Sequence, residues 1–178
     1  MKVTEYRWTT DQLRQNARDL RAGDRLLLSG VAYTARDAAH KRILQALKDA
    51  DSLPFTLTGA VIYYAGPTPA PIGRAIGSCG PTTSSRMDPY TPALYDLGVI
   101  ATIGKGERSV SVAEAIRRNG GVYLCALGGA GALASQCITA SRVIAYDDLG
   151  CESVKEIVLS DFPLIVGIDA VGGNIFQR

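Results

Sequence analysis

The chain has 178 residues, enough for one domain with a sizeable core, and we expect a single domain over residues 1–178. Its 19 Lys and Arg residues nearly balance its 17 Asp and Glu residues, which gives no electrostatic reason to expect binding to nucleic acid or an anionic membrane. No stretch approaches the roughly 20 apolar residues of a membrane span, and residues 1–7 lack the apolar core of a signal peptide, so we expect a cytoplasmic protein.

The beginning of the chain predicts a strand, a helix and a second strand. Residues 2–8 alternate enough to indicate a strand, and Thr10 is placed to cap a helix over residues 11–20. Residues 24–30 then form a short apolar run closed by glycine, which is typical of a buried strand.

A longer helix is expected next, followed by another strand. Thr34 is placed to cap a helix over residues 35–50, whose apolar positions recur at helical spacing. On that register Arg36 and His40 lie four residues apart and share a face near the start of the helix. Residues 59–65 have the β-branched and aromatic content of a strand.

Hydroxyl and charged side chains then gather in a stretch bounded by glycine turns. Behind a Gly-Pro turn, and just before an expected helix, stand Thr82, Thr83, Ser84, Ser85, Arg86 and Asp88. Free amides at the start of a helix, together with its dipole, favour an anion. An apolar strand over residues 99–103 delivers Lys105 between two glycines. The stretch predicts a site for a small carboxylate or phosphate.

The remaining elements continue to alternate. Ser111 is placed to cap a helix over residues 109–118, which Asn119 and two glycines end. A buried strand, a helix and an extended segment are expected at residues 122–127, 130–139 and 142–146. Further strands are expected at residues 154–159, 164–169 and 174–176. Because strands and helices alternate, the predicted fold class is α/β.

Each charged or polar candidate has a functional and a structural interpretation. An Arg fork such as Arg86 binds a carboxylate through two parallel hydrogen bonds, but it could equally be a surface residue. Lys105 could be a ligand contact or a solvated turn lysine. Arg36 and His40 could form a second carboxylate grip, although a lone histidine is more often structural, even with a pKa suited to proton transfer near neutrality.

Thr82 could bind the small acidic ligand through its hydroxyl or act as a helix cap. Thr83 or Ser84 could fill the capping role instead.

A glycine-rich loop resembles a dinucleotide fingerprint. Gly129 and Gly131 follow an apolar strand and precede an expected helix, with Asp147 and Asp148 further on. The competing interpretation is close packing of a helix start on a sheet. We favour packing, because the unit lies late in the chain and lacks the flanking βαβ pairs of a Rossmann sheet.

Three motifs in order carry a family resemblance. They are Tyr33-Thr-Ala-Arg-Asp-Ala-Ala-His-Lys-Arg42, Gly80-Pro-Thr-Thr-Ser-Ser-Arg-Met-Asp88 and Ile103-Gly-Lys-Gly106. Over about residues 23–176 the chain resembles the iron–sulfur hydro-lyases, class I fumarase and tartrate dehydratase. The match is to the half that forms the C-terminal domain of one-chain enzymes and a separate beta subunit in two-chain ones. Asp88 directly after Met87 makes the chain more similar to the fumarase branch.

The resemblance implies a fold, an activity and site residues. The fold would be a swivelling β/β/α-type domain, and the activity would be the reversible hydration of fumarate to L-malate by a beta subunit. The alternatives are a tartrate dehydratase or mesaconate hydratase beta subunit, or a nucleotide-binding α/β module that uses the Gly129 loop. The expected catalytic residues are Thr82 and Lys105, and Thr82 matches a family threonine that takes part in proton abstraction. A threonine hydroxyl is a poor base unless a neighbour takes its proton, and Asp88 is the only carboxylate within this motif, so the activating group could lie on the partner subunit. The expected substrate-binding residues are Arg36, Arg86, Thr83, His40 and Asp88.

The family's four-iron four-sulfur cluster is expected to lie on a partner. The four cysteines, Cys79, Cys125, Cys137 and Cys151, are widely separated and lack the Cys-x-x-Cys pairing of metal sites. We expect four reduced, mostly buried thiols and no metal bound by this chain alone. The expected partners are a small dicarboxylate and a fumarase alpha subunit that carries the cluster, in a heterodimer or heterotetramer.

Overall fold

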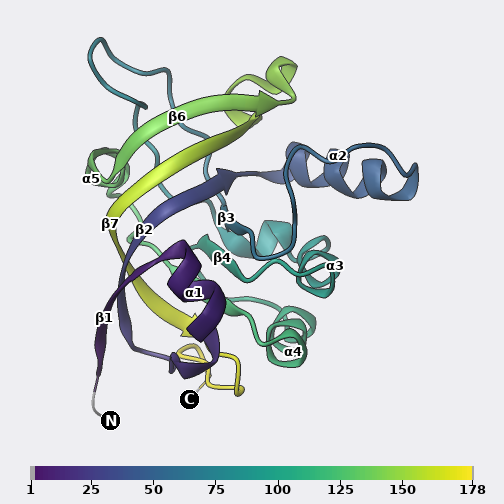
Figure 1. The fold of residues 1–178 in the computed structure, drawn as a ribbon, viewed down its shortest axis with the longest axis vertical. Coiled ribbons are helices and arrows are strands. Elements are labelled where there is room, and N and C mark those ends of the chain that lie inside the picture. Colours follow the sequence, from purple (N-terminus) through teal and green to yellow (C-terminus); the bar gives the residue numbers. More distant parts are fainter. Residues whose placement is uncertain (1–2, 178) are drawn as a thin grey trace.

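The computed structural model describes residues 3–177, whose strands form one seven-stranded sheet (Figure 1). The strands are β1 (Glu5–Thr9), β2 (Arg25–Thr34), β3 (Val61–Tyr63), β4 (Ala101–Gly104), β5 (Val122–Cys125), β6 (Ile138–Ala145) and β7 (Val154–Ile168). The α-helices are α1 (Thr10–Asn16), α2 (Asp37–Lys48), α3 (Thr91–Asp96), α4 (Val110–Asn119) and α5 (Gly131–Gln136). Short 3-10 helices are η1 (Ala17–Asp19), η2 (Ser84–Met87) and η3 (Asp147–Glu152). The predicted α/β class is confirmed.

The strand pairings close a ring. β2, β3, β4 and β5 pair in parallel, one after the next, while β7 pairs antiparallel with both β5 and β2. β1 and β6 extend the sheet as outer strands beside β2 and β7. Figure 1 shows α2, α3 and α4 along one side of this ring. The carboxyl ends of β2, β3, β4 and β5 therefore meet at one end of the ring.

Alternation along the central strands explains their continuous apolar sequence. In β3, Val61 and Tyr63 join the core cluster that also contains Leu26 and Leu28, whereas Ile62 packs in a second cluster with residues of α2 and α3. Successive side chains of a strand point to opposite faces, and both faces of β3 are covered. A strand buried on both faces has no reason to carry polar residues.

Three expectations for the strands and their ends were wrong. The strand predicted to stop at Gly30 runs on to Thr34. Gly30 does not end the strand but lies where the pairing of β2 with β7 shifts in register. Its φ is +117°, and a Cβ there would lie 2.5 Å from Oγ1 of Thr10. Residues 154–159 and 164–169 belong to one strand, β7, and residues 174–176 contribute only an isolated bridge from Asn174 to Ile168.

The predicted helix caps were also shifted. Thr9, not Thr10, caps α1, and it forms a capping box with Gln12. Thr34 is the last residue of β2, and its hydroxyl accepts a hydrogen bond from the Lys155 amide at 3.1 Å. Ser109, not Ser111, precedes α4.

The end of α4 is as predicted, since Gly120 adopts the left-handed conformation there with φ +69°. None of the helices within residues 3–177 has the length and hydropathy that crossing a bilayer requires.

Candidate functional site

The predicted site residues cluster where the parallel strands end. Arg36 follows β2 by two residues and immediately precedes α2, and Lys105 directly follows β4. The segment containing Thr82 is held at the end of β3, because the Thr82 amide donates a hydrogen bond to the Tyr64 carbonyl at 2.6 Å. Ligand sites in sheets with parallel strands form at these carboxyl ends.

The two predicted arginines meet at one carboxylate. Arg86 donates from Nε to one oxygen of Asp37 at 3.0 Å and from an Nη nitrogen to the other at 2.8 Å. Nε of Arg36 lies 3.9 Å from the same carboxylate. Arg86 is half exposed and Arg36 is 21% exposed, so both remain within reach of a ligand. Asp37 thus holds two cations in one small region.

Glu152 supports the same region from η3. One of its oxygens lies 3.4 Å from an Nη of Arg36, and the other accepts a hydrogen bond from the Ala38 amide at 3.2 Å. This carboxylate satisfies an unpaired amide in the first turn of α2, where an acidic group also suits the helix dipole. It fills the role that the sequence assigned to Thr34. Nε of Arg36 is buried and has no hydrogen-bond partner within residues 3–177.

The predicted hydroxyls lie beside Lys105. Thr83 and Lys105 form a parallel bridge, and the Ser84 amide donates to the Lys105 carbonyl at 2.9 Å. The expected helix at this point is only the 3-10 helix η2, and α3 does not begin until Thr91. The α-helix start expected directly after these hydroxyls is therefore wrong. Binding of an anion by these residues stays a prediction.

Asp88 is occupied by a buried arginine that the sequence analysis did not single out. Its two oxygens accept from Nε of Arg108 and from the Ser109 amide, both at 2.7 Å. The Arg108 side chain is fully buried, and its guanidinium lies over the rings of Tyr64 and Tyr123. Both oxygens of Asp88 are thus engaged within the fold, and substrate contact by Asp88 stays a prediction.

His40 lies in the protein interior, next to the backbone of Arg36. It is fully buried, and its Nδ1 donates to the Arg36 carbonyl at 2.8 Å, which leaves Nε2 unprotonated and without a partner among the described residues. Burial lowers the pKa of His40 to about 4. The expectation of a pKa suited to proton transfer near neutrality is therefore wrong. Direct contact of His40 with a substrate stays a prediction.

The cysteines are poorly suited to a metal cluster. Burial raises the pKa of Cys79 to about 12, which disfavours the thiolate that binds iron. Cys125 and Cys137 are partly buried and Cys151 is exposed, so the thiols are less buried than expected. Residues 3–177 contain no group of three or more His, Cys, Asp or Glu side chains that could hold a metal ion. These residues do not fit a four-iron cluster.

Close packing accounts for one glycine of the loop after β5. A Cβ on Gly131 would lie 2.4 Å from Oγ of Ser78 and 3.0 Å from the Gly80 amide nitrogen. The Gly131 carbonyl accepts a hydrogen bond from the Cys79 amide at 3.0 Å. The close packing is therefore against residues 78–80, which belong to no strand, and not against the sheet as expected. A Cβ on Gly129 would meet no atom within 4 Å, and Gly129 instead adopts a φ of +75°.

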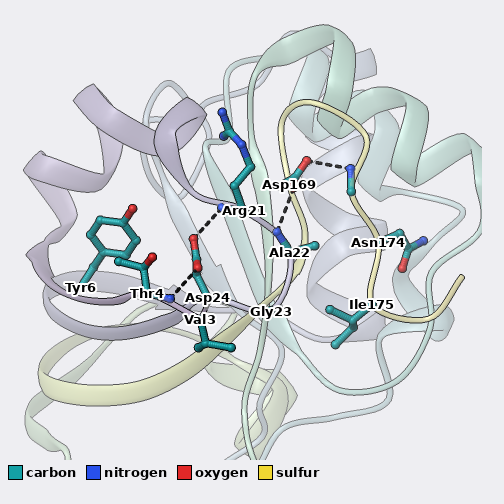
Figure 2. Close-up of a pocket in the computed structure, with 11 residues that line it drawn as sticks. Val3, Thr4, Tyr6, Arg21, Ala22, Gly23, Asp24, Asp169, Asn174 and Ile175 are labelled. Atoms are coloured by element: carbon teal, nitrogen blue, oxygen red, sulfur yellow. Dashed lines mark hydrogen bonds between the residues drawn. The ribbon is translucent and has the colours of Figure 1, made fainter. Parts of the chain in front are cut away.

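A hollow of about 430 Å³ lies at the other end of the ring, away from these residues (Figure 2). Its two carboxylates are both engaged by backbone amides. Asp24 accepts from Thr4 and Arg21, and Asp169 accepts from Ala22 and Gly173. These bonds fix the loops where the chain enters β2 and leaves β7. The two carboxylates that line the hollow therefore have structural roles.

Sequence comparison places the chain among known proteins. It matches the family described as "Fumarase C-terminus" over residues 2–178. Fumarate hydratase 2 of Leishmania major is 37% identical over 170 residues, which cover 94% of this chain and 30% of the relative. The aerobic class I fumarate hydratase of Escherichia coli K12 is 38% identical over 156 residues, which cover 86% of this chain and 28% of the relative.

A third relative is close to this chain in length. The putative L(+)-tartrate dehydratase subunit beta of Methanocaldococcus jannaschii is 36% identical over 171 residues, which cover 93% of this chain and 88% of the relative. The chain thus spans less than a third of these two fumarate hydratases but most of the archaeal subunit.

Proposed function

The chain belongs to the Fumarase C-terminus family, and on that premise we propose that it is the beta subunit of a two-chain hydro-lyase that interconverts fumarate and L-malate. Residues 1–178 act as one domain in this proposal. The match over 88% of a relative named as a beta subunit supports the beta-subunit part of this proposal. The cytoplasmic location expected from the sequence stays a prediction.

The observation that carries the proposal is the cluster of Arg36, Arg86 and Lys105 at the carboxyl ends of β2, β3 and β4. A dicarboxylate carries two negative charges, and Arg forks bind each carboxylate through parallel charge-assisted hydrogen bonds. Two arginines tied to one carboxylate, with a lysine at the neighbouring strand end, provide complementary charge for such a ligand.

The proposal divides the labour among these residues. Arg36 and Arg86 neutralise and orient the dicarboxylate, and Thr83 adds a hydrogen bond. The resemblance to the family supports a role for Thr82 in removing a proton beside a carboxylate, and Lys105 would stabilise the charge that develops there. Positioning of this kind lowers a barrier by several kcal/mol.

The group that accepts the Thr82 proton is proposed to lie on a partner chain. Asp88 is held by Arg108 and His40 is buried, so neither suits that role. The four-iron four-sulfur cluster also belongs to the partner in this proposal, because the cysteines of this chain do not fit it. When bound, such a cluster supplies a Lewis acid for the departing hydroxyl. The partner would be an alpha subunit in a heterodimer or heterotetramer.

Tartrate is the second candidate substrate. The relative of similar length is named for L(+)-tartrate, and its identity of 36% is close to the 37% and 38% of the fumarate hydratases. L-malate and tartrate differ by one hydroxyl group. A site that hydrogen-bonds that hydroxyl would discriminate strongly between them.

Reconstitution tests the proposal. This chain is mixed without oxygen with the cluster-bearing subunit of the same organism, and fumarate formation from L-malate is followed, with tartrate and mesaconate as competing substrates. Activity in the mixture but in neither chain alone is the expected result. Preference for tartrate or mesaconate would change the substrate, and no turnover of any dicarboxylate with an intact cluster would overturn the proposal.

A further inference from the structure

The turn that presents Lys105 is held at three consecutive carbonyls. The Gly104 carbonyl accepts from the Ala126 amide at 2.9 Å, and the Lys105 carbonyl accepts from the Ser84 amide at 2.9 Å. The Gly106 carbonyl accepts from the hydroxyl of Tyr123 at 2.9 Å. A lysine between two glycines would otherwise have an unusually free backbone. The neighbouring elements remove that freedom.

One of these contacts reaches back to the hydroxyl-rich segment. Oγ of Ser84 lies 2.9 Å from the Tyr123 hydroxyl oxygen, and both side chains are fully buried. Tyr123 has a single hydroxyl proton, which it gives to the Gly106 carbonyl, so Ser84 must donate to the Tyr123 oxygen. A directed chain therefore runs from Ser84 through Tyr123 to Gly106. It joins the segment that carries Thr82 to the turn that carries Lys105.

Gly104 makes this contact sterically feasible. A Cβ at position 104 would lie 2.0 Å from Oγ of Ser84 and 2.9 Å from the ring of Tyr64. Ser84 thus rests directly on the backbone of β4. The guanidinium of Arg108 lies 4.9 Å from the centre of the Tyr123 ring, which fixes that ring from its face.

We propose that Ser84 and Tyr123 are positioning residues that hold Lys105 in register with Thr82. Neither side chain has exposed surface, so neither touches the substrate. Their role is to fix the distance between two segments that lie about twenty residues apart in the sequence. This inference rests on the proposed function for its catalytic consequence, but the restraint on the turn does not depend on any reaction.

Tyr95 offers a matched control for Tyr123. Both are fully buried in the same apolar cluster, and both hydroxyls make two hydrogen bonds. The Tyr95 partners are Oγ1 of Thr102 and the Val122 carbonyl, each at 2.8 Å, and neither belongs to the Lys105 turn. Tyr95→Phe therefore costs a similar loss of buried hydrogen bonds without releasing the turn.

The first test measures amide hydrogen exchange in the full chain. Tyr123→Phe is expected to speed exchange in residues 82–87 and 104–107 by about tenfold or more relative to Tyr95→Phe, because local opening governs exchange. Ser84→Ala is expected to act in the same direction and serves if Tyr123→Phe does not fold. Equal exchange in these segments for the Tyr123 and Tyr95 variants, or no change in Ser84→Ala, would overturn the proposal.

The second test uses the reconstituted complex. Tyr123→Phe is expected to lower kcat about tenfold or more while KM changes by less than about threefold, because Lys105 is released from its position relative to Thr82, whereas the Arg86 side chain is still held by Asp37. A merely structural role would lower kcat equally in Tyr95→Phe, and that result would refute positioning. An inactive wild-type complex would refute the proposed function instead, while the exchange result would still decide the restraint.

Discussion

Arg86 and Asp37 form a two-point ion pair that joins η2 to the start of α2 across 49 residues of sequence. A second pair, Arg118 and Asp96, has the same geometry, with Nε and an Nη nitrogen on the two carboxylate oxygens at 2.8 and 2.7 Å. It joins α3 to α4, and Arg118 is 49% exposed against 50% for Arg86. The Arg118–Asp96 pair therefore serves as a control for variants of the Arg86–Asp37 pair, because it has the same geometry but lies outside the proposed site.

Asp37→Asn is expected to weaken substrate binding with little cost in stability. The amide keeps the size of the side chain but provides one acceptor oxygen in place of two, so the Arg86 fork is no longer fixed. KM for L-malate should rise about fivefold or more, whereas the free energy of unfolding should change by less than about 1 kcal/mol, because exposed ion pairs contribute little. Steady-state kinetics of the reconstituted complex and urea unfolding measure the two quantities.

The control for this change is Asp96→Asn. It breaks a two-point pair whose arginine is equally exposed, and its KM should equal that of the wild type. Equal KM values for the two variants would show that Asp37 has no special role in the site.

Arg86→Met should remove the carboxylate grip itself. Methionine keeps much of the aliphatic stem but has no donor, so the substrate loses two charge-assisted hydrogen bonds. We expect kcat/KM to fall about a hundredfold or more, at 1.4 kcal/mol for each factor of ten. Arg118→Met is the matched variant, since it removes the same fork from the α3–α4 pair. Normal kinetic constants for Arg86→Met would exclude Arg86 from the site.

Thr82→Val separates catalysis from binding. Valine has nearly the same shape as threonine but no hydroxyl, so a proton-transfer role predicts a fall in kcat of about a hundredfold or more with KM nearly unchanged. Thr83→Val, one residue further on, should instead raise KM, because Thr83 is proposed to bind and not to react. Similar small effects of both substitutions would reduce Thr82 to a structural hydroxyl.

The order of elements could be predicted from the sequence because the central strands carry unbroken apolar runs. The residues of β3, β4 and β5 are buried or nearly so, and each strand begins and ends within a few positions of its expected bounds. The neighbourhood of Arg86 and Lys105 follows from the rule that parallel strands end on the same side. Their partners do not follow from any local rule.

Long-range partners are what the sequence could not reveal. Glu152 supports the start of α2 from 114 residues away, and Arg108 is held by Asp88 inside the fold. The gap expected between the strands at residues 154–159 and 164–169 is instead a bulge within β7. Asp161 has a φ of +47° there, and its amide donates to Oγ of Ser29. β7 continues past this bulge because β2 pairs with it on both sides, from Lys155 to Ile165, and β5 pairs with its last residues. Local propensity says nothing about such a neighbour.

Asp88→Asn should destabilise the chain strongly. Arg108 is fully buried, and losing the charge of its partner leaves a desolvated guanidinium with only neutral acceptors and aromatic rings around it. Breaking a buried pair from one side costs about 3 kcal/mol or more. Asp148→Asn, which breaks an exposed pair with Arg42, is the control and should have little effect on urea unfolding. Equal midpoints for the two variants would mean that Arg108 does not depend on Asp88.

The stability of the chain should fall as the pH drops below neutrality because of His40. Burial lowers the folded-state pKa of His40 to about 4, whereas an unfolded histidine titrates near 6.5. Between these values the unfolded chain binds a proton that the folded chain does not, so stability rises with pH across this window and is lost on acidification. From pH 7 to pH 5 the loss amounts to about 2 kcal/mol.

His40 is the only histidine, so this slope can be assigned to one group. Urea unfolding at pH 5, 6 and 7 measures it, and His40→Phe, which keeps a ring beside Tyr64 and Tyr90, should remove it. Carboxylates titrate mainly below pH 5 and contribute little above it. An unchanged slope in His40→Phe would mean that His40 has a similar pKa in the folded and unfolded chains, and the slope would then have to come from other groups.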